Sequence, residues 1–155
     1  MNVVEESILI RAPHEALFDL SQDYGLRLEW DPFLRDLRFL DGAATAAAGV
    51  KVWVRAWNRL EMTVEFVAFN RPHAVAMRMV RGPLLFRTFA GSWRFQPGEG
   101  DAVEVIFRYT FQTRWPWLRW LVDPMVRWAL RRDVRARLRG LRRGAEEQGL
   151  LDRLS

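Results

Sequence analysis

The chain has 155 residues, half of them hydrophobic, so it can form one domain with a substantial core but not a second domain of normal size. It contains no cysteine, which excludes disulfides, thiolate metal sites and cysteine nucleophiles. The formal net charge is +5, and nearly all the positive charge is arginine because Lys51 is the only lysine. The N-terminus lacks a signal peptide pattern, and no apolar run approaches the roughly 20 residues of a membrane span, so we expect a cytoplasmic protein.

The first part of the chain predicts a strand followed by two short helices. Apolar and polar residues alternate over 3–11, as in a half-buried strand. Pro13 suits a helix start, where its missing N–H has no partner to lose, and residues 16–20 have helical spacing. A second short helical segment over 26–30 ends at Asp31-Pro32.

From Phe33 the apolar pattern changes to a period of two, which is the period of a strand. Turn signals interrupt this pattern several times, the strongest being the segment 96–101. Residues 43–49 are small and weakly patterned and are expected to form a loop. The predicted strands are 33–40, 50–55, 60–66, 74–81, 86–95 and 103–111.

The C-terminal part predicts helix. Pro116 and Pro124 both stand at plausible helix starts, and Asp123 is a suitable N-cap for the second. We therefore expect a short helix from Pro116 and a long one from Pro124 to about Gln148, or a single helix kinked at Pro124. An apolar stripe runs along one side of this segment and arginines occupy the other, so one face packs on the rest of the protein.

The order of these elements predicts the fold class. Short connections between consecutive strands indicate an antiparallel meander, and one amphipathic helix must cover one face of the resulting sheet. The sequence therefore predicts a single α+β domain over 1–155, without a linker or an internal repeat.

Four segments carry a resemblance to a known family: 10–18, 29–32, 67–72 and 91–95. With the element order, which matches over nearly the whole chain, they resemble the START-like (SRPBCC) superfamily and, within it, the polyketide cyclase/dehydrase and lipid-transport group. The resemblance implies a helix-grip fold, in which a curved seven-stranded antiparallel sheet wraps around the C-terminal helix and leaves an apolar cavity. Members bind lipids, polyketides or plant hormones, and some cyclise or dehydrate polyketides.

Strand alternation within this fold predicts which residues face the cavity. The inward set is wide, apolar and rich in methionine, as in many ligand pockets. For any one of these residues, the alternative is that it belongs to a packed core and does not line a cavity. The predicted apolar and aromatic ligand-binding residues are Met62, Val64, Phe66, Met77, Met79, Phe89, Trp93, Phe107, Tyr109, Phe111, Trp117, Leu121 and Met125.

Two arginines are predicted to supply the polar contacts of this cavity. The alternation that turns Met79 inward also turns Arg81 inward, and Arg87 is turned inward with Phe89 in the same way. We expect Arg81, Arg87 and Tyr109 to bind a carboxylate, enolate or phenolate of an otherwise apolar ligand, because guanidinium groups suit planar anions. The alternative is that both arginines reach solvent at the ends of their strands.

No catalytic constellation stands out, so catalytic residues remain unassigned. His14 and His73 both lie next to prolines in predicted exposed positions, and Glu61, Glu65 and Glu104 alternate onto the outward face. No phosphate loop, zinc-binding helix motif or nucleophile elbow is present in the sequence. We therefore expect no cofactor and no metal.

Tryptophan and arginine occur together in two places. Trp53 and Trp57 share a polar face with Lys51 and Arg55, where they form cation–π stacks or a dimer contact, unless they face the cavity instead. The segment 114–120, together with Trp128, is typical of a transient membrane-surface contact, or else its tryptophans are buried.

These patterns favour binding or carriage of a hydrophobic small molecule as the function. The alternative is an enzyme of the polyketide cyclase/dehydrase type, acting on a bound poly-keto chain. A third interpretation, an interaction module, would use the basic C-terminal helix to bind anionic membrane or nucleic acid. No known nucleic-acid motif appears, so nucleic acid is not an expected partner.

Overall fold

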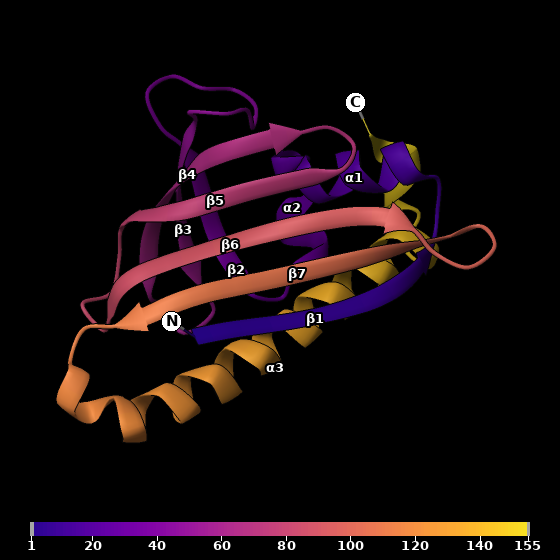
Figure 1. The fold of residues 1–155 in the computed structure, drawn as a ribbon. Helices are drawn as coiled ribbons and strands as arrows, with labels where there is room; N and C mark the ends of the chain where they lie inside the picture. Colours follow the sequence, from indigo (N-terminus) through magenta and orange to yellow (C-terminus); the bar gives the residue numbers. More distant parts are fainter. Residues whose placement is uncertain (1, 155) are drawn as a thin grey trace.

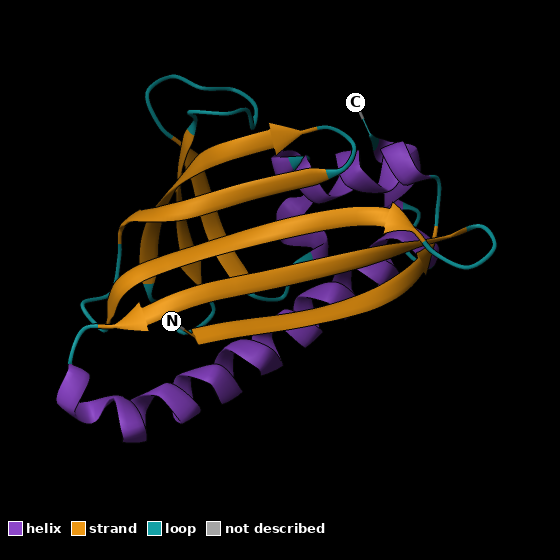
Figure 2. Cartoon of the chain, in the orientation of Figure 1, coloured by secondary structure: helices purple, strands orange, loops and turns teal. Residues whose placement is uncertain are grey.

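A computed structural model describes residues 2–154, in which a curved antiparallel sheet wraps around one long helix (Figures 1 and 2). This arrangement confirms the predicted α+β helix-grip class. The elements are β1 (Asn2–Arg11), α1 (His14–Gln22), α2 (Tyr24–Trp30), β2 (Leu34–Phe39), β3 (Lys51–Ala56), β4 (Glu61–Asn70), β5 (Ala74–Arg81), β6 (Phe86–Pro97), β7 (Ala102–Thr113), the 3-10 helix η1 (Pro116–Leu118), α3 (Arg119–Glu146) and the 3-10 helix η2 (Leu150–Arg153).

The sheet has the order β1-β7-β6-β5-β4-β3-β2, with every pair antiparallel. Strands β2 to β7 form the predicted meander. β1 joins this meander at β7, with Arg11 opposite Ala102 and Asn2 opposite Phe111. α1 and α2 carry the chain from β1 at one edge of the sheet to β2 at the other (Figure 1).

α3 packs against β1, β7 and α2. It is one continuous helix with Pro124 inside it. The prediction that a separate helix starts at Pro124 is therefore wrong, and the alternative, a single helix that runs through Pro124, is observed. Proline is tolerated there because the only bond that it removes is the one to the carbonyl of Trp120, whose residue is 77% exposed. The first turns of α3 extend beyond the adjacent ends of β6 and β7 (Figure 1).

Asp123 does not cap a helix, in contrast to the prediction. Its carboxylate accepts hydrogen bonds from Asn2 Nδ2 at 2.8 Å and Thr113 Oγ1 at 2.6 Å. These bonds hold the pKa of Asp123 below its usual value against the opposing effect of burial. The side chain therefore ties α3 to the adjacent ends of β1 and β7.

Glycine allows α3 to approach the end of α2 closely. A Cβ at Gly140 would overlap the carbonyl oxygen of Trp30, and a Cβ at Gly144 would lie 3.1 Å from the Cβ of Trp30. Because both contacts bring the backbone of α3 directly against Trp30, they fix the relative position of the two helices that hold the polar part of the site described below.

Candidate ligand-binding cavity

A cavity of about 220 Å³ lies between the inner face of the sheet and α3. Most of its lining is apolar and comes from strands β3 to β7 and from one face of α3. The strand residues include Val54, Met62, Val64, Met77, Met79, Phe89, Phe107 and Tyr109, and the α3 residues include Val126, Ala129 and Leu130. The lining residues Asn58, Leu60 and Glu61 are exposed, which places the opening at the turn between β3 and β4.

Part of the predicted site lines this cavity and part does not. Met62, Val64, Met77, Met79, Phe89, Phe107 and Tyr109 belong to the lining. Phe66, Trp93 and Phe111 point to the same side of the sheet but are buried in the core outside the lining.

The predicted inward position of three residues near the start of α3 is wrong. Trp117 is 72% exposed, Leu121 is 48% exposed and Met125 is 65% exposed, and none of them lines the cavity. The reason is that the first turns of α3 extend past the edge of the sheet. The first residues of the apolar stripe therefore have no strand to pack against.

Arg81 and Arg87 are also placed differently from the prediction, since both are exposed and lie outside the lining. A bulge in β5 explains Arg81: it pairs with Thr63 while Met79 pairs with Val64, so one extra residue on β5 breaks the alternation. Arg87 is itself the extra residue of a bulge in β6. Neither arginine therefore contacts the cavity.

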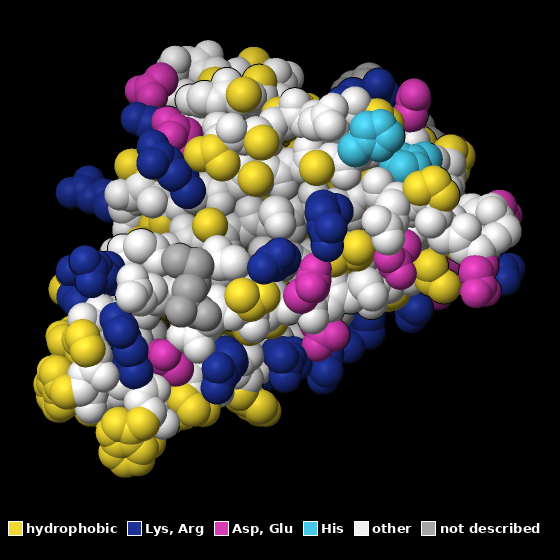
Figure 3. Space-filling model, in the orientation of Figure 1, with side chains coloured by type: hydrophobic (Ala, Val, Ile, Leu, Met, Phe, Trp, Pro, Cys, Tyr) yellow, Lys and Arg dark blue, Asp and Glu magenta, His cyan; other side chains and the backbone are white. Residues whose placement is uncertain are grey.

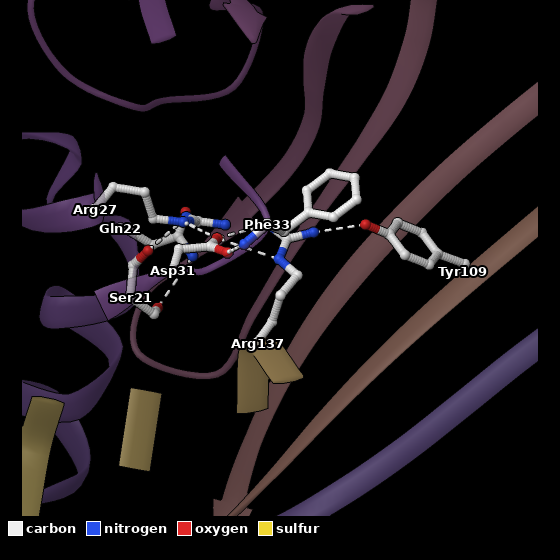
Figure 4. Close-up of polar contacts among 7 residues, drawn as sticks. All are labelled: Ser21, Gln22, Arg27, Asp31, Phe33, Tyr109 and Arg137. Carbon is white, nitrogen blue, oxygen red and sulfur yellow. Dashed lines mark hydrogen bonds and ion pairs between the residues drawn. The ribbon is translucent and has the colours of Figure 1, made fainter. Parts of the chain in front are cut away.

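A buried polar cluster lies at the inner end of the cavity instead (Figure 4). It consists of Arg27 from α2, Asp31 at the end of α2, Arg137 from α3 and Tyr109 from β7, all of them buried. The Asp31 Oδ2 atom accepts from Arg27 Nε at 2.8 Å and Arg137 Nε at 3.1 Å, and it lies 3.0 Å from Arg137 Nη2. Arg137 Nη1 donates to the Tyr109 hydroxyl at 2.5 Å.

Backbone groups complete this cluster. Arg27 Nη1 donates to the carbonyl of Ser21 at 2.7 Å, and Asp31 Oδ1 accepts from the backbone N–H of Phe33 at 3.0 Å. Both carboxylate oxygens of Asp31 are therefore occupied by donors. The two guanidinium groups are held in place from three separate elements.

The charges of the cluster do not cancel. Burial opposes the ionisation of Asp31, but Arg137 and Arg27 outweigh it and hold the pKa of Asp31 below its usual value. Burial raises the pKa of Tyr109, although Arg137 opposes this, so the phenol stays protonated at neutral pH. Because arginine stays charged in proteins, two cations face one anion.

Aromatic rings surround the two cations. The Arg27 guanidinium carbon lies 4.9 Å from the ring centre of Trp30, and that of Arg137 lies 4.9 Å from the ring centres of Phe33 and Phe107. The faces of such rings carry partial negative charge and offset part of the cost of burying the excess cation.

The apolar pattern of the sequence does not predict this cluster, although the position of Arg137 in the helix is a signal of its burial. The division of this helix into an apolar and a basic side predicts that Arg137 faces solvent. However, it follows Leu130 by seven positions and Val134 by three, and so belongs to the buried stripe. Arg27 and Asp31 are four positions apart, a spacing that usually means an exposed pair on a helix surface.

The two tryptophans left open by the sequence both lie outside the cavity lining. The guanidinium carbons of Arg38 and Arg55 lie 4.9 Å and 5.7 Å from the ring centre of Trp53, whose Nε1 donates to Glu61 Oε1 at 3.0 Å. Trp57 is 43% exposed, with Arg132 of α3 at 5.4 Å from its ring. The cation–π interpretation is therefore the observed one for both.

The histidines lie away from the cavity. His73 is exposed as predicted, whereas His14 is partly buried and contacts the carbonyl of Pro72 at 2.9 Å. Their rings meet edge to face at 5.7 Å. Over residues 2–154, no three His, Asp or Glu side chains gather in the way that metal ligands do.

Comparison with known proteins identifies the fold. The family described as polyketide cyclase / dehydrase and lipid transport matches residues 1–146. No curated protein matches the chain. Within residues 2–154, no helix is both long and apolar enough to cross a bilayer.

Solved structures share this fold at low sequence identity. A Thermus thermophilus protein has a TM-score of 0.76 and 20% identity, with 91% of this chain and 94% of that chain covered. A START superfamily protein of Mycobacterium smegmatis has a TM-score of 0.77, 11% identity and coverage of 94% and 98%. Norcoclaurine synthase of Thalictrum flavum, as a point mutant with a transition state analogue, has a TM-score of 0.72, 13% identity and coverage of 95% of each chain.

Proposed function

Because the chain belongs to the polyketide cyclase/dehydrase and lipid transport family, we propose that it binds or carries a hydrophobic small molecule in the cavity between its sheet and α3. The observation that supports this proposal is the mostly apolar lining of that cavity, with polar groups only at its opening and at its inner end. Ligand pockets of small molecules have this composition, in which apolar surface supplies affinity and a few polar groups fix orientation.

The cavity volume limits the ligand. About 220 Å³ exceeds the roughly 150 Å³ of an engineered apolar cavity that admits benzene. A one- or two-ring aromatic molecule or a short acyl chain matches this space. A longer molecule would extend through the opening beside Leu60.

Filling the cavity tests the proposal. Ala129 lines it from α3, so Ala129→Phe is expected to weaken binding of the neutral fluorescent probe N-phenyl-1-naphthylamine by about tenfold or more, because the new ring occupies ligand space. The measurement is a fluorescence titration of purified protein.

Arg139→Phe is the matched control, since it adds the same ring to an exposed position of the same helix. It should leave the affinity within about twofold of the unmodified protein. Equal affinities for all three proteins would contradict binding in this cavity, and an absence of binding to the unmodified protein would contradict the proposed function.

Catalysis of the cyclase or dehydrase type is the second candidate, and the position of Tyr109 favours it. Its oxygen accepts from Arg137, so its own proton is available for a substrate carbonyl inside the cavity. A placed donor of this kind stabilises the negative charge that develops on oxygen when a keto group reacts.

Tyr109→Phe separates the two candidates. If the protein cyclises or dehydrates a poly-keto thioester, this variant is expected to turn over about 100-fold more slowly while still binding N-phenyl-1-naphthylamine. Product formation followed by mass spectrometry is the measurement. No turnover by the unmodified protein would remove the enzymatic candidate and leave the binding function.

A further inference from the structure

The polar end of the cavity carries one positive charge more than its own residues neutralise. Arg27 and Arg137 share Asp31 as their carboxylate partner, and the neutral Tyr109 completes the cluster. Burying an uncompensated charge is costly, so this arrangement is most stable when an anion occupies the adjacent space.

We infer that this cluster binds the anionic group of an apolar acid, such as a carboxylate or an enolate, and so selects the ligand class. The inference rests on the proposed function, because it needs the apolar part of the ligand to occupy the cavity. Arg27, Arg137 and Tyr109 all line that cavity.

The cluster also has donors to offer. Each guanidinium carries five N–H groups, and the bonds to Asp31, Ser21 and Tyr109 use only some of them. The Tyr109 hydroxyl adds a proton beside Arg137. Two guanidinium groups and a phenol around one space match the several lone pairs of a carboxylate.

One other acidic side chain, Asp133, lines the cavity near this cluster. Burial raises the pKa of Asp133 against the influence of Arg132, which lies 4.0 Å from it. Its direct partners are Arg132 and Trp57, and Arg137 of the cluster also lowers its pKa. Because the charge of Asp133 is shared with Arg132, it offsets only part of the charge of Arg137 and none of the hydrogen bonds of the cluster reach it.

Octanoate and 1-octanol test the inference because they share a chain length and differ in the anionic group. Each is titrated against protein loaded with N-phenyl-1-naphthylamine, and octanoate is expected to displace the probe at about tenfold lower concentration. Arg27→Met, which leaves one cation facing Asp31, is expected to abolish this preference. Arg87→Met removes an exposed arginine and should keep it.

The outcomes separate this inference from the proposed function. Equal displacement by octanoate and octanol would overturn the anion preference while leaving binding of apolar molecules intact. A preference that survives in Arg27→Met and in Tyr109→Phe would place the anion elsewhere and overturn it too. Failure of the probe itself to bind would overturn both proposals.

A separate surface lies at the start of α3. Large apolar side chains gather there and project into solvent, at the lower left of Figure 3. Their exposed fractions are 72% for Trp117, 77% for Trp120, 65% for Met125 and 66% for Trp128, and Leu84 in the β5–β6 turn is 74% exposed. We call these five residues the tryptophan surface.

The charge around the tryptophan surface is positive. The segment 114–132 contains five arginines and a single acidic residue, Asp123, which Asn2 and Thr113 already engage. Tryptophan prefers the interface between water and lipid, and arginine attracts anionic headgroups. Two copies joined through this surface would bring their arginines together, which disfavours a symmetric dimer.

From this second observation the geometry points to an anionic phospholipid bilayer as the partner of the tryptophan surface. Met125 and Trp128 of this surface are direct chain neighbours of Val126 and Ala129, which line the cavity from α3. A bilayer bound here would lie beside the cavity, so that an apolar ligand has a short path between the two.

Co-sedimentation with vesicles tests whether the tryptophan surface binds an anionic bilayer. Binding to vesicles of phosphatidylcholine with about 30% phosphatidylglycerol is expected to exceed binding to pure phosphatidylcholine by about tenfold, and to fall as salt is added. The triple variant Trp117→Ala, Trp120→Ala, Trp128→Ala should lose at least about tenfold, whereas Trp53→Ala, on the outer face of the sheet, should not.

Two results would overturn bilayer binding. One is equal sedimentation of the triple variant and the unmodified protein. The other is a concentration-dependent dimer that sediments without vesicles and dissociates in the triple variant, because it would identify the partner as a second copy of the chain.

Discussion

Replacing Asp31 with alanine is expected to lower the free energy of unfolding by about 3–5 kcal/mol. Asp31 is 2% exposed and is the shared carboxylate partner of Arg27 and Arg137. Without it, two buried guanidinium groups keep their charge and face one another with no anion between them. Urea denaturation followed by far-UV circular dichroism measures the change.

Asp36→Ala is the matched control. Asp36 pairs with Arg55 at 3.6 Å, but the two side chains are 41% and 44% exposed, so this variant should lose less than about 1 kcal/mol. The triple variant Asp31→Leu, Arg27→Met, Arg137→Met should recover most of the lost stability, because it leaves no unpaired charge. Similar losses in Asp31→Ala and Asp36→Ala would contradict the central role of Asp31.

Trp93→Ala is expected to lower the free energy of unfolding by about 3–5 kcal/mol. The Trp93 ring is fully buried, with the Phe107 ring centre at 4.5 Å, that of Trp30 at 6.0 Å and the guanidinium carbons of Arg27 and Arg137 at 5.5 and 5.8 Å. Its removal leaves a void and takes an aromatic face away from both cations. Chemical denaturation again gives the change.

Trp93→Phe should cost much less, roughly 1–2 kcal/mol. Within residues 2–154, the Trp93 Nε1–H group is buried without a hydrogen-bond partner, so phenylalanine removes an unsatisfied donor while keeping a ring. The exposed Trp128 provides the control, and Trp128→Ala should change stability by no more than about 0.5 kcal/mol. A Trp93→Phe loss as large as that of Trp93→Ala would show that the indole shape itself is required.

The regular parts of the fold could be predicted from the sequence because alternation reports which face of a strand is buried. Met62, Val64, Met77 and Met79 line the cavity as alternation predicts. Alternation fails at Arg81 and Arg87, because a single extra residue in a bulge reverses every side chain beyond it. Nothing local in the sequence marks those bulges.

The polar cluster could not be predicted for a different reason. Reading a helix by its apolar stripe assigns every arginine to solvent, and this rule hides Arg137 among its many exposed neighbours. Burial of Arg137 depends on Asp31, which is 106 positions away in the chain. How far the sheet extends along α3 also depends on residues distant in the chain. The apolar stripe alone therefore predicts that Trp117 and Met125 face the sheet, although the sheet does not reach them.

The position of β1 in the sheet has a consequence for the order in which the protein forms. The hydrogen-bonding partners of β1 in β7 lie roughly 90 positions or more later, and Val4 and Ile10 are fully buried in the finished sheet. At roughly 5–20 residues per second, a ribosome needs about 5–20 s to make the intervening chain. During that interval this apolar strand is unpaired and available to chaperones, and the addition of β1 to the edge of the sheet by so distant a pairing is expected to be the slow step of folding.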